Sequence, residues 1–231
     1  MIAAGASLET SKQAIELANK YDKVWATVGL HPDEINSEFR ITDYELLIKE
    51  SKVVAVGEVG LDYYKKEQSF DELRVKQKEV FSQFIDLALE TGKPLVLHCR
   101  SEENGQSAHE DAIEILSKSY VLNPKSLGGV VHSFTGTLDE AKKYLNLGFC
   151  LGLNGIITFT DQYDEVVRYT PLEQILLETD APWLTPVPNR GKRNEPFGVI
   201  EVAKKIATLK NISFDEVAQE TFANTQNLFK I

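Results

Sequence analysis

Five residues that bind metal ions or transfer protons occur where short apolar segments end. These residues are His31, Glu58, His98, His132 and Asp180. One such histidine alone would most simply be a core or surface residue, but a hydrophobic core gives no reason for repeated acids and imidazoles at segment ends. Imidazole and carboxylate ligands without cysteine suit Zn²⁺, Mn²⁺ or Mg²⁺. The pattern predicts a divalent-metal site, where Glu58 could bridge two ions and Asp180 could bind one and accept a proton from the attacking water.

A proline-rich loop after Asp180 carries three cations within four positions, Arg190, Lys192 and Arg193. Guanidinium groups suit phosphate oxygens, so we interpret Arg190 and Arg193 as candidate phosphate-binding residues. A solvated basic loop is the alternative. Arg100, two residues after His98, is a further phosphate-binding candidate, with a surface ion pair as its alternative.

Two further segment ends could contact a substrate. Asn154 and Gly155 could offer an amide and a permissive backbone, although a plain turn explains them equally well. Tyr63 and Tyr64 follow Glu58 on what we expect to be a loop, where one ring could stack on a base and at least one should pack beneath the loop.

Alternating β-rich and amphipathic segments must position these residues. We expect strands at Ile2–Gly5, Val24–Gly29, Val53–Val56, Pro94–His98, Gly129–His132, Phe149–Asn154 and Ile175–Thr179. We expect helices near Glu9–Lys20, Thr42–Glu50, Asp71–Thr91, Ser107–Lys118, Leu138–Leu147, Tyr163–Arg168, Gly198–Lys210 and Ser213–Asn227, with capping boxes starting at Thr42 and Ser213.

This alternation predicts an α/β fold with a parallel sheet. An open doubly wound sheet is one option. A TIM-type barrel explains the pattern better, because seven strands plus one missing unit make eight, and a barrel brings the carboxyl ends of its strands to one face. We expect residues 1–231 to form a single barrel domain that lacks its first βα unit.

Composition sets limits on function. The 231 residues carry a net charge of −10, which argues against a general nucleic-acid coat protein. Two cysteines far apart in sequence argue against a disulfide framework and favour a cytoplasmic setting. Because no apolar run reaches the length of a membrane span, we expect no membrane partner.

The ordered motifs resemble those of the TatD family, and the resemblance spans almost the whole chain. The motifs are Val28-Gly29-Leu30-His31-Pro32, Gly57-Glu58-Val59-Gly60-Leu61-Asp62-Tyr63, Leu97-His98-Cys99-Arg100, His132-Ser133-Phe134-Thr135-Gly136, Glu178-Thr179-Asp180-Ala181-Pro182, the basic loop and Ala223-Asn224-Thr225-Gln226-Asn227-Leu228-Phe229.

The resemblance implies a metal-dependent hydrolase with two divalent ions that cleaves phosphodiester bonds of DNA, acting as an exonuclease on single-stranded DNA or DNA ends. By position, Glu58 would bridge the ions, and His98 and His132 would complete the second site. Asp180 would bind the first ion, and His31 would lie at the substrate phosphate. We expect a monomer.

The sequence departs from the family pattern at its start. Family members begin with a strand that ends in a His-x-His pair, and no such pair occurs here. We therefore expect a truncated N-terminus and an incomplete first metal site. Hydrolysis of another ester, such as an aminoacyl-tRNA or a small phosphate ester, and a non-catalytic binding role remain the alternatives.

Overall fold

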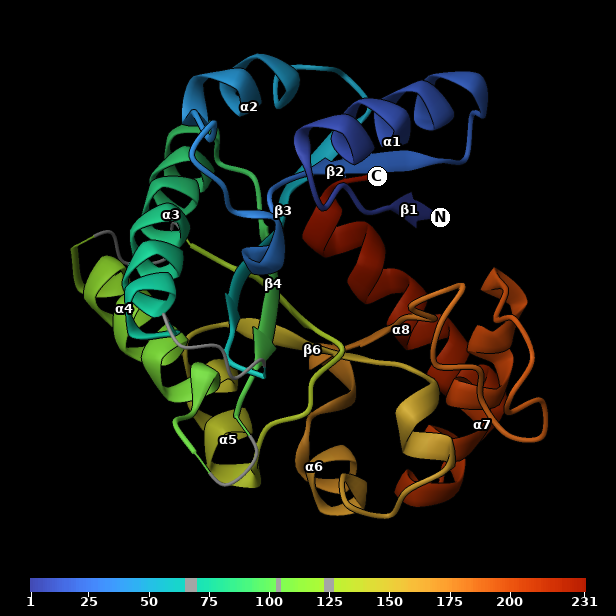
Figure 1. Ribbon diagram of the computed structural model, residues 1–231. Helices are drawn as coiled ribbons and strands as arrows, with labels where there is room; N and C mark the ends of the chain where they lie inside the picture. The colour runs from blue at the N-terminus through green and yellow to red at the C-terminus, as the bar shows by residue number, and fades with distance from the viewer. Residues whose placement is uncertain (65–69, 103–104, 123–126) are drawn as a thin grey trace. The chain divides into compact units, whose positions relative to one another are not determined.

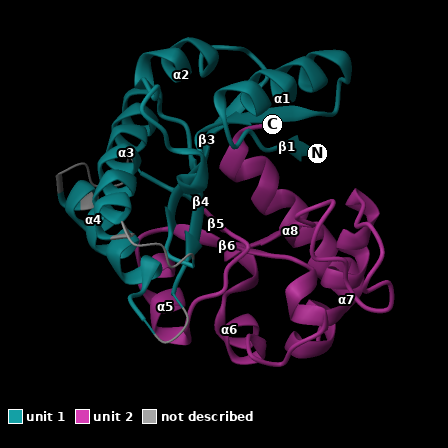
Figure 2. Cartoon of the chain, viewed as in Figure 1, with its two compact units in different colours: residues 1–129 teal, residues 130–231 magenta. Residues whose placement is uncertain are grey.

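The computed structural model describes residues 1–64, 70–102, 105–122 and 127–231. The chain divides into two compact units, Met1–Gly129 and Val130–Ile231 (Figure 2). The prediction of one barrel domain over residues 1–231 stays a prediction.

The first unit builds its sheet from parallel strands whose order follows the chain (Figure 1). The pairs β1–β2, β2–β3 and β3–β4 are all parallel. The elements are β1 (Ile2–Ala3), α1 (Leu8–Lys20), β2 (Trp25–Val28), η1 (Pro32–Glu34), α2 (Ile41–Leu47), β3 (Val53–Asp62), α3 (Phe70–Thr91), β4 (Leu95–Arg100) and α4 (Ala108–Leu122).

The second unit continues the alternation of strands and helices. Its strands β6 and β7 pair in parallel, with Leu151 opposite Ile175 and Leu153 opposite Leu177. The elements are β5 (Gly129–His132, which starts at the boundary residue), α5 (Leu138–Asn146), β6 (Phe149–Leu153), η2 (Gly155–Thr158), α6 (Asp164–Tyr169), η3 (Leu172–Gln174), β7 (Ile175–Leu177), η4 (Pro196–Gly198), α7 (Val199–Lys210) and α8 (Phe214–Phe229).

Each unit has its own apolar core. In the first unit, the ring of Phe84 on α3 packs edge-on against Tyr44, with ring centroids 5.1 Å apart. In the second unit, a cluster on α7 that includes Val202 and Ile206 packs with strand residues such as Ile175. Among the described residues, no helix combines the length and apolarity that crossing a bilayer requires.

The seven expected strands and eight expected helices are confirmed, but the end of β3 was predicted wrongly. The sequence indicated a strand that stops at Val56, followed by a loop. In the structure, β3 runs to Asp62. A Cβ atom at Gly60 would lie 2.0 Å from the carbonyl oxygen of His98, so this glycine lets β3 and β4 approach closely.

Helix starts were predicted with mixed success. Ser213 caps α8 by accepting a hydrogen bond from the backbone N–H of Glu216, which is one of the two bonds of the predicted capping box. The predicted cap at Thr42 is wrong, because α2 begins at Ile41 and places Thr42 inside its first turn. A capping box that the sequence analysis did not predict joins Thr137 and Glu140 at the start of α5.

The capping box of α5 leads to a stability prediction. Thr137→Ala removes the acceptor for the Glu140 N–H, so the free energy of unfolding should fall by about 1 kcal/mol. Urea unfolding followed by circular dichroism measures the change. Thr42→Ala is the matched control and should leave the midpoint almost unchanged; equal losses in both variants would contradict the assignment.

Candidate metal and phosphate site

In the first unit, the imidazole of His98 lies between two carboxylates. Its Nδ1 atom is 2.8 Å from Oε1 of Glu58, and its Nε2 atom is 3.0 Å from Oδ2 of Asp62. Because β3 is extended, Glu58 and Asp62 project from the same face of one strand. Gly60 lies opposite His98 in the register of β3 and β4. Strand geometry thus places both acids around one ring.

The charges of this cluster shift its protonation. Burial alone would lower the pKa of His98, but hydrogen bonds and charges from Asp62 and Glu58 outweigh it, so the pKa lies above the usual range. Burial would raise the pKa of Asp62, yet the hydrogen bond to His98 and that from the backbone N–H of Tyr64 hold it low. The cluster therefore favours an imidazolium between two carboxylates when no cation replaces its protons.

His31 lies beside this cluster in a different protonation state. Its ring centroid is 4.2 Å from that of His98, and burial followed by repulsion from His98 lowers its pKa. Its Nδ1 atom accepts a hydrogen bond from the backbone N–H of Asp33. A neutral ring that accepts at Nδ1 carries its proton at Nε2, so His31 presents an N–H donor, 3.9 Å from Oε1 of Glu58.

Buried contacts fix the backbone around Asp62. The side-chain amide of Gln77 on α3 accepts from the Asp62 N–H at 3.0 Å and donates to the Asp62 carbonyl at 3.1 Å. Next in the chain, the buried Tyr63 donates its hydroxyl hydrogen to Asp111 at 2.8 Å, and burial raises the pKa of this phenol. Tyr63 is thus the packing residue that we expected in this tyrosine pair.

A second histidine has the same surroundings within the second unit. The Nδ1 atom of His132 is 2.6 Å from Oε2 of Glu178, and its Nε2 atom is 3.4 Å from Oδ1 of Asp180. The N–H of Ser133 also donates to Oε2 of Glu178, at 3.0 Å. Ser133 and Asp180 both adopt left-handed backbone conformations, with φ of 48° and 55°. Each unit thus holds one histidine with a carboxylate at both ring nitrogens.

Asn154, the N-cap residue of η2, supports the second cluster. Its Nδ2 atom donates to Oγ of Ser133 at 2.7 Å, and its Oδ1 atom accepts from the N–H of Ile156 at 3.1 Å. The residue is buried, with 2% of its surface exposed. Both ends of its amide therefore bond within the protein, and its predicted contact with substrate stays a prediction.

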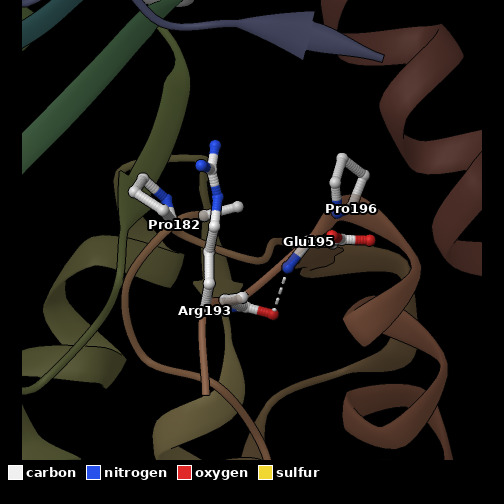
Figure 3. A pocket seen from close by; sticks show the side chains of 6 residues that line it. Pro182, Arg193, Glu195 and Pro196 are labelled. Carbon is white, nitrogen blue, oxygen red and sulfur yellow. Dashed lines mark hydrogen bonds between the residues drawn. The ribbon is translucent and has the colours of Figure 1, made fainter. Parts of the chain in front are cut away.

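The predicted phosphate-binding arginines are exposed. Arg100 stacks on the ring of Tyr64, 3.5 Å from its centroid, and Arg190 lies 3.8 Å from the ring centroid of Phe159. Arg193 lines a surface depression of about 390 Å³ that is otherwise lined by Ala181, Pro182, Asn194, Glu195 and Pro196. In Figure 3, the Arg193 side chain extends past Pro182 with its guanidinium away from the ribbon.

The structure joins the predicted residues in two groups. His31, Glu58 and His98 lie together in the first unit, and His132 and Asp180 lie together in the second. Two acids were not predicted as ligands. Asp62 was placed on a loop, although its spacing of four from Glu58 fits one face of a strand. Glu178 directly follows β7 and precedes Asp180 by two residues.

The donor chemistry of both groups fits divalent cations. Ligand atoms of His31, Asp62 and His98 lie within 4.8 Å of one another. Glu58 and Asp62 lie at opposite nitrogens of His98, so an ion bound to one nitrogen of this ring can share only the carboxylate on that side. Imidazole and carboxylate groups are ligands that Zn²⁺, Mn²⁺ and Mg²⁺ all accept. Residues of this chain therefore offer donors that suit a divalent metal ion.

Comparisons with known proteins agree with this chemistry. The family model described as TatD related DNase matches residues 1–230. The chain is 39% identical over 218 residues to the metal-dependent hydrolase YcfH of Escherichia coli strain K12, covering 94% of this chain and 77% of YcfH. It is 34% identical to the 3'-5' ssDNA/RNA exonuclease TatD of Edwardsiella piscicida, covering 100% of this chain and 88% of that protein.

A solved structure extends the likeness to three dimensions. The crystal structure of the TatD homolog YjjV from Escherichia coli K12 is similar with a TM-score of 0.87 and 29% identity. The match covers 100% of this chain and 86% of the YjjV chain. The predicted fold class, a TIM-type barrel of the metal-dependent hydrolase class with seven strands in this sequence, is confirmed.

The packing of Glu178 leads to a prediction for the second cluster. A Cβ atom at Gly152 would lie 1.6 Å from Oε1 of Glu178, so Gly152→Ala must displace this carboxylate from His132 and Ser133. We expect the free energy of unfolding to fall by about 1–3 kcal/mol in urea titrations. In a Glu178→Ala background the same change should cost much less. Equal costs in both backgrounds would show that Glu178 is not the residue displaced.

Proposed function

Because the chain belongs to the TatD related DNase family of metal-dependent hydrolases, we propose that it cleaves phosphodiester bonds of DNA. We propose single-stranded DNA ends as its substrate, attacked by an exonuclease mechanism. The name of the Edwardsiella piscicida relative, an exonuclease on single-stranded DNA and RNA, supports this choice.

The observation that carries the proposal is the histidine held between two acids in each unit. Hydrophobic packing gives no reason to bury His98 between Glu58 and Asp62, or to hold His132 between Glu178 and Asp180. Taking charged groups out of water costs free energy even when they are paired, and such clusters gather at functional sites, where a charged ligand can use them. We propose two divalent ions, Mg²⁺, Mn²⁺ or Zn²⁺, with Glu58, His98, His132 and Asp180 as ligands, and we add Asp62.

We assign a role in the proposed reaction to groups of each unit. Bound divalent ions supply Lewis-acid polarisation of the phosphate and a water of lowered pKa. Asp180, 33% exposed at its side chain, would accept the proton of the attacking water. Glu58 holds its carboxylate against His98 and keeps that ring oriented.

Donors are proposed to bind the substrate phosphates. The Nε2–H of the neutral His31 can donate to a phosphate oxygen, which agrees with the role that the family resemblance implied. Arg100, Arg190 and Arg193 add exposed guanidinium groups, whose fork geometry matches phosphate oxygens. Asn154 contributes by holding Ser133 beside His132.

Nuclease activity is the direct test of the proposal. We expect the purified protein with Mg²⁺ or Mn²⁺ to release nucleotides from an end-labelled single-stranded oligonucleotide, and EDTA to abolish the release. Glu58→Gln keeps the size of the side chain but removes its charge, so kcat should fall by about 100-fold or more.

The matched control is Glu16→Gln, which changes an exposed acid on α1 and should keep full activity. A panel of duplex DNA, aminoacyl-tRNA and small phosphate esters measured on the same preparation tests substrate choice. Metal-independent release, or full activity of Glu58→Gln, would rule out the proposed mechanism.

Metal binding tests the added ligand separately from activity. Asp62→Asn removes a buried carboxylate, so the affinity for Mn²⁺ measured by isothermal titration calorimetry should fall by about tenfold or more. Asp86→Asn, at an exposed position of α3, is the control. Unchanged Mn²⁺ affinity in Asp62→Asn would remove Asp62 from the ligand set.

A further inference from the structure

Trp183 is exposed to an extent that is uncommon for so large an aromatic residue. Its exposed fraction is 71%, although an indole gains free energy when it leaves water. The indole therefore offers a large apolar face that a ligand could cover.

The backbone of Trp183 is nevertheless held at both of its polar groups. Its N–H donates to the carbonyl of Asp180 at 2.8 Å. Its carbonyl accepts from Nδ2 of Asn194 at 2.7 Å. The exposed ring thus stands on a turn that is fixed directly to the candidate metal ligand Asp180, so little backbone entropy is lost when a ligand binds to it.

Asn194 joins this turn to the basic loop. Its Nδ2 atom also donates to the carbonyl of Thr179 at 2.7 Å, its Oδ1 atom accepts from the N–H of Glu195 at 2.9 Å, and its own N–H donates to the carbonyl of Pro182 at 3.0 Å. The side chain is buried, with 3% exposed. Asn194 therefore bonds to the residues that precede and follow Asp180, and it fixes the position from which Arg193 projects.

The depression beside Asn194 combines the cation Arg193 and the acid Glu195 with apolar walls. Arg193 lines it together with Pro182, the residue before Trp183, and Pro196 (Figure 3). Lys192 is also exposed next to Arg193. Trp183 is tied to this loop through its carbonyl, which bonds to the side chain of Asn194, the residue after Arg193. Cations and exposed aromatic rings are the groups with which proteins bind single-stranded nucleic acid, through phosphate contacts and base stacking.

We propose that Trp183 and Arg193 form a binding site for one nucleotide of single-stranded DNA, and that Asn194 is its positioning residue. A base stacks on the indole while its phosphate pairs with the guanidinium. Stacking needs an unpaired base, so the site favours single strands over duplexes. The choice of DNA rests on the proposed function, whereas binding itself needs no cleavage.

Trp183 itself reports on the site, because Trp25 is the only other tryptophan. In a Trp25→Phe background, we expect a short oligothymidylate to quench the emission of Trp183, both in buffer with EDTA and in a separate buffer with Ca²⁺. A hairpin duplex should quench this emission much less. Trp183→Ala should weaken oligothymidylate binding by about tenfold, measured by anisotropy of a labelled strand. Phe222→Ala, which removes a ring of similar exposure (64%) from α8, is the matched control.

The positioning role of Asn194 has its own readout. Asn194→Ala should lower the anisotropy of Trp183 emission in the free protein and weaken oligothymidylate binding, while circular dichroism confirms that the variant is folded. With Asn194 present, Arg193→Ala should reduce the slope of log binding constant against log salt concentration by about one. In the Asn194→Ala background, the same change should reduce this slope by less. Additive effects, or unchanged anisotropy, would overturn this role.

The outcomes separate this inference from the proposed function. Cleavage of DNA without quenching, and with full binding by Trp183→Ala, would overturn the site and leave the nuclease proposal standing. Binding with quenching but no cleavage in Mg²⁺ or Mn²⁺ would overturn the nuclease proposal and support the site. The absence of both binding and cleavage would overturn the binding site and the nuclease proposal together.

Discussion

In both units, carboxylates compensate the charge of a partly buried histidine, and the rest of the candidate site depends on this interaction. His98 and His132 are each 16% exposed at the side chain, and each has carboxylates at both ring nitrogens. An imidazole with one acid could be an ordinary ion pair. Two acids leave a net negative site once the ring is neutral, which is the electrostatic condition for binding a divalent cation.

The strands and their connections must place both acids within hydrogen-bond distance of each histidine to satisfy this condition. In the first unit, β3 brings Glu58 and Asp62 to one face because the strand continues through Gly60, where any side chain would collide with the backbone of His98. In the second unit, the left-handed backbone of Asp180 lets its side chain reach His132. Local backbone geometry is therefore part of the site and not only its support.

The sequence predicts the elements well because alternating β-rich and amphipathic segments reflect burial on both faces of a parallel sheet. It also predicts the histidines and two of the acids, since they stand at segment ends. It missed Asp62, because glycines that permit close strand packing resemble turn residues in the sequence. It missed the role of Asn194, since three hydrogen bonds between positions 179 and 195 depend on the path of a loop that no periodicity describes.

An acidic protein can bind a polyanion only where its local field differs from its net charge. The chain has a net charge of −10, yet charges separated by more than about 8–10 Å are largely screened at physiological salt. A phosphate near Arg193 is therefore affected mainly by the charges of that loop, which are the cations Arg190, Lys192 and Arg193 and the acid Glu195. Because the proposed base contact with Trp183 is apolar, salt should weaken it less than the phosphate contacts. A site built from few cations and one exposed ring is thus compatible with an acidic protein surface.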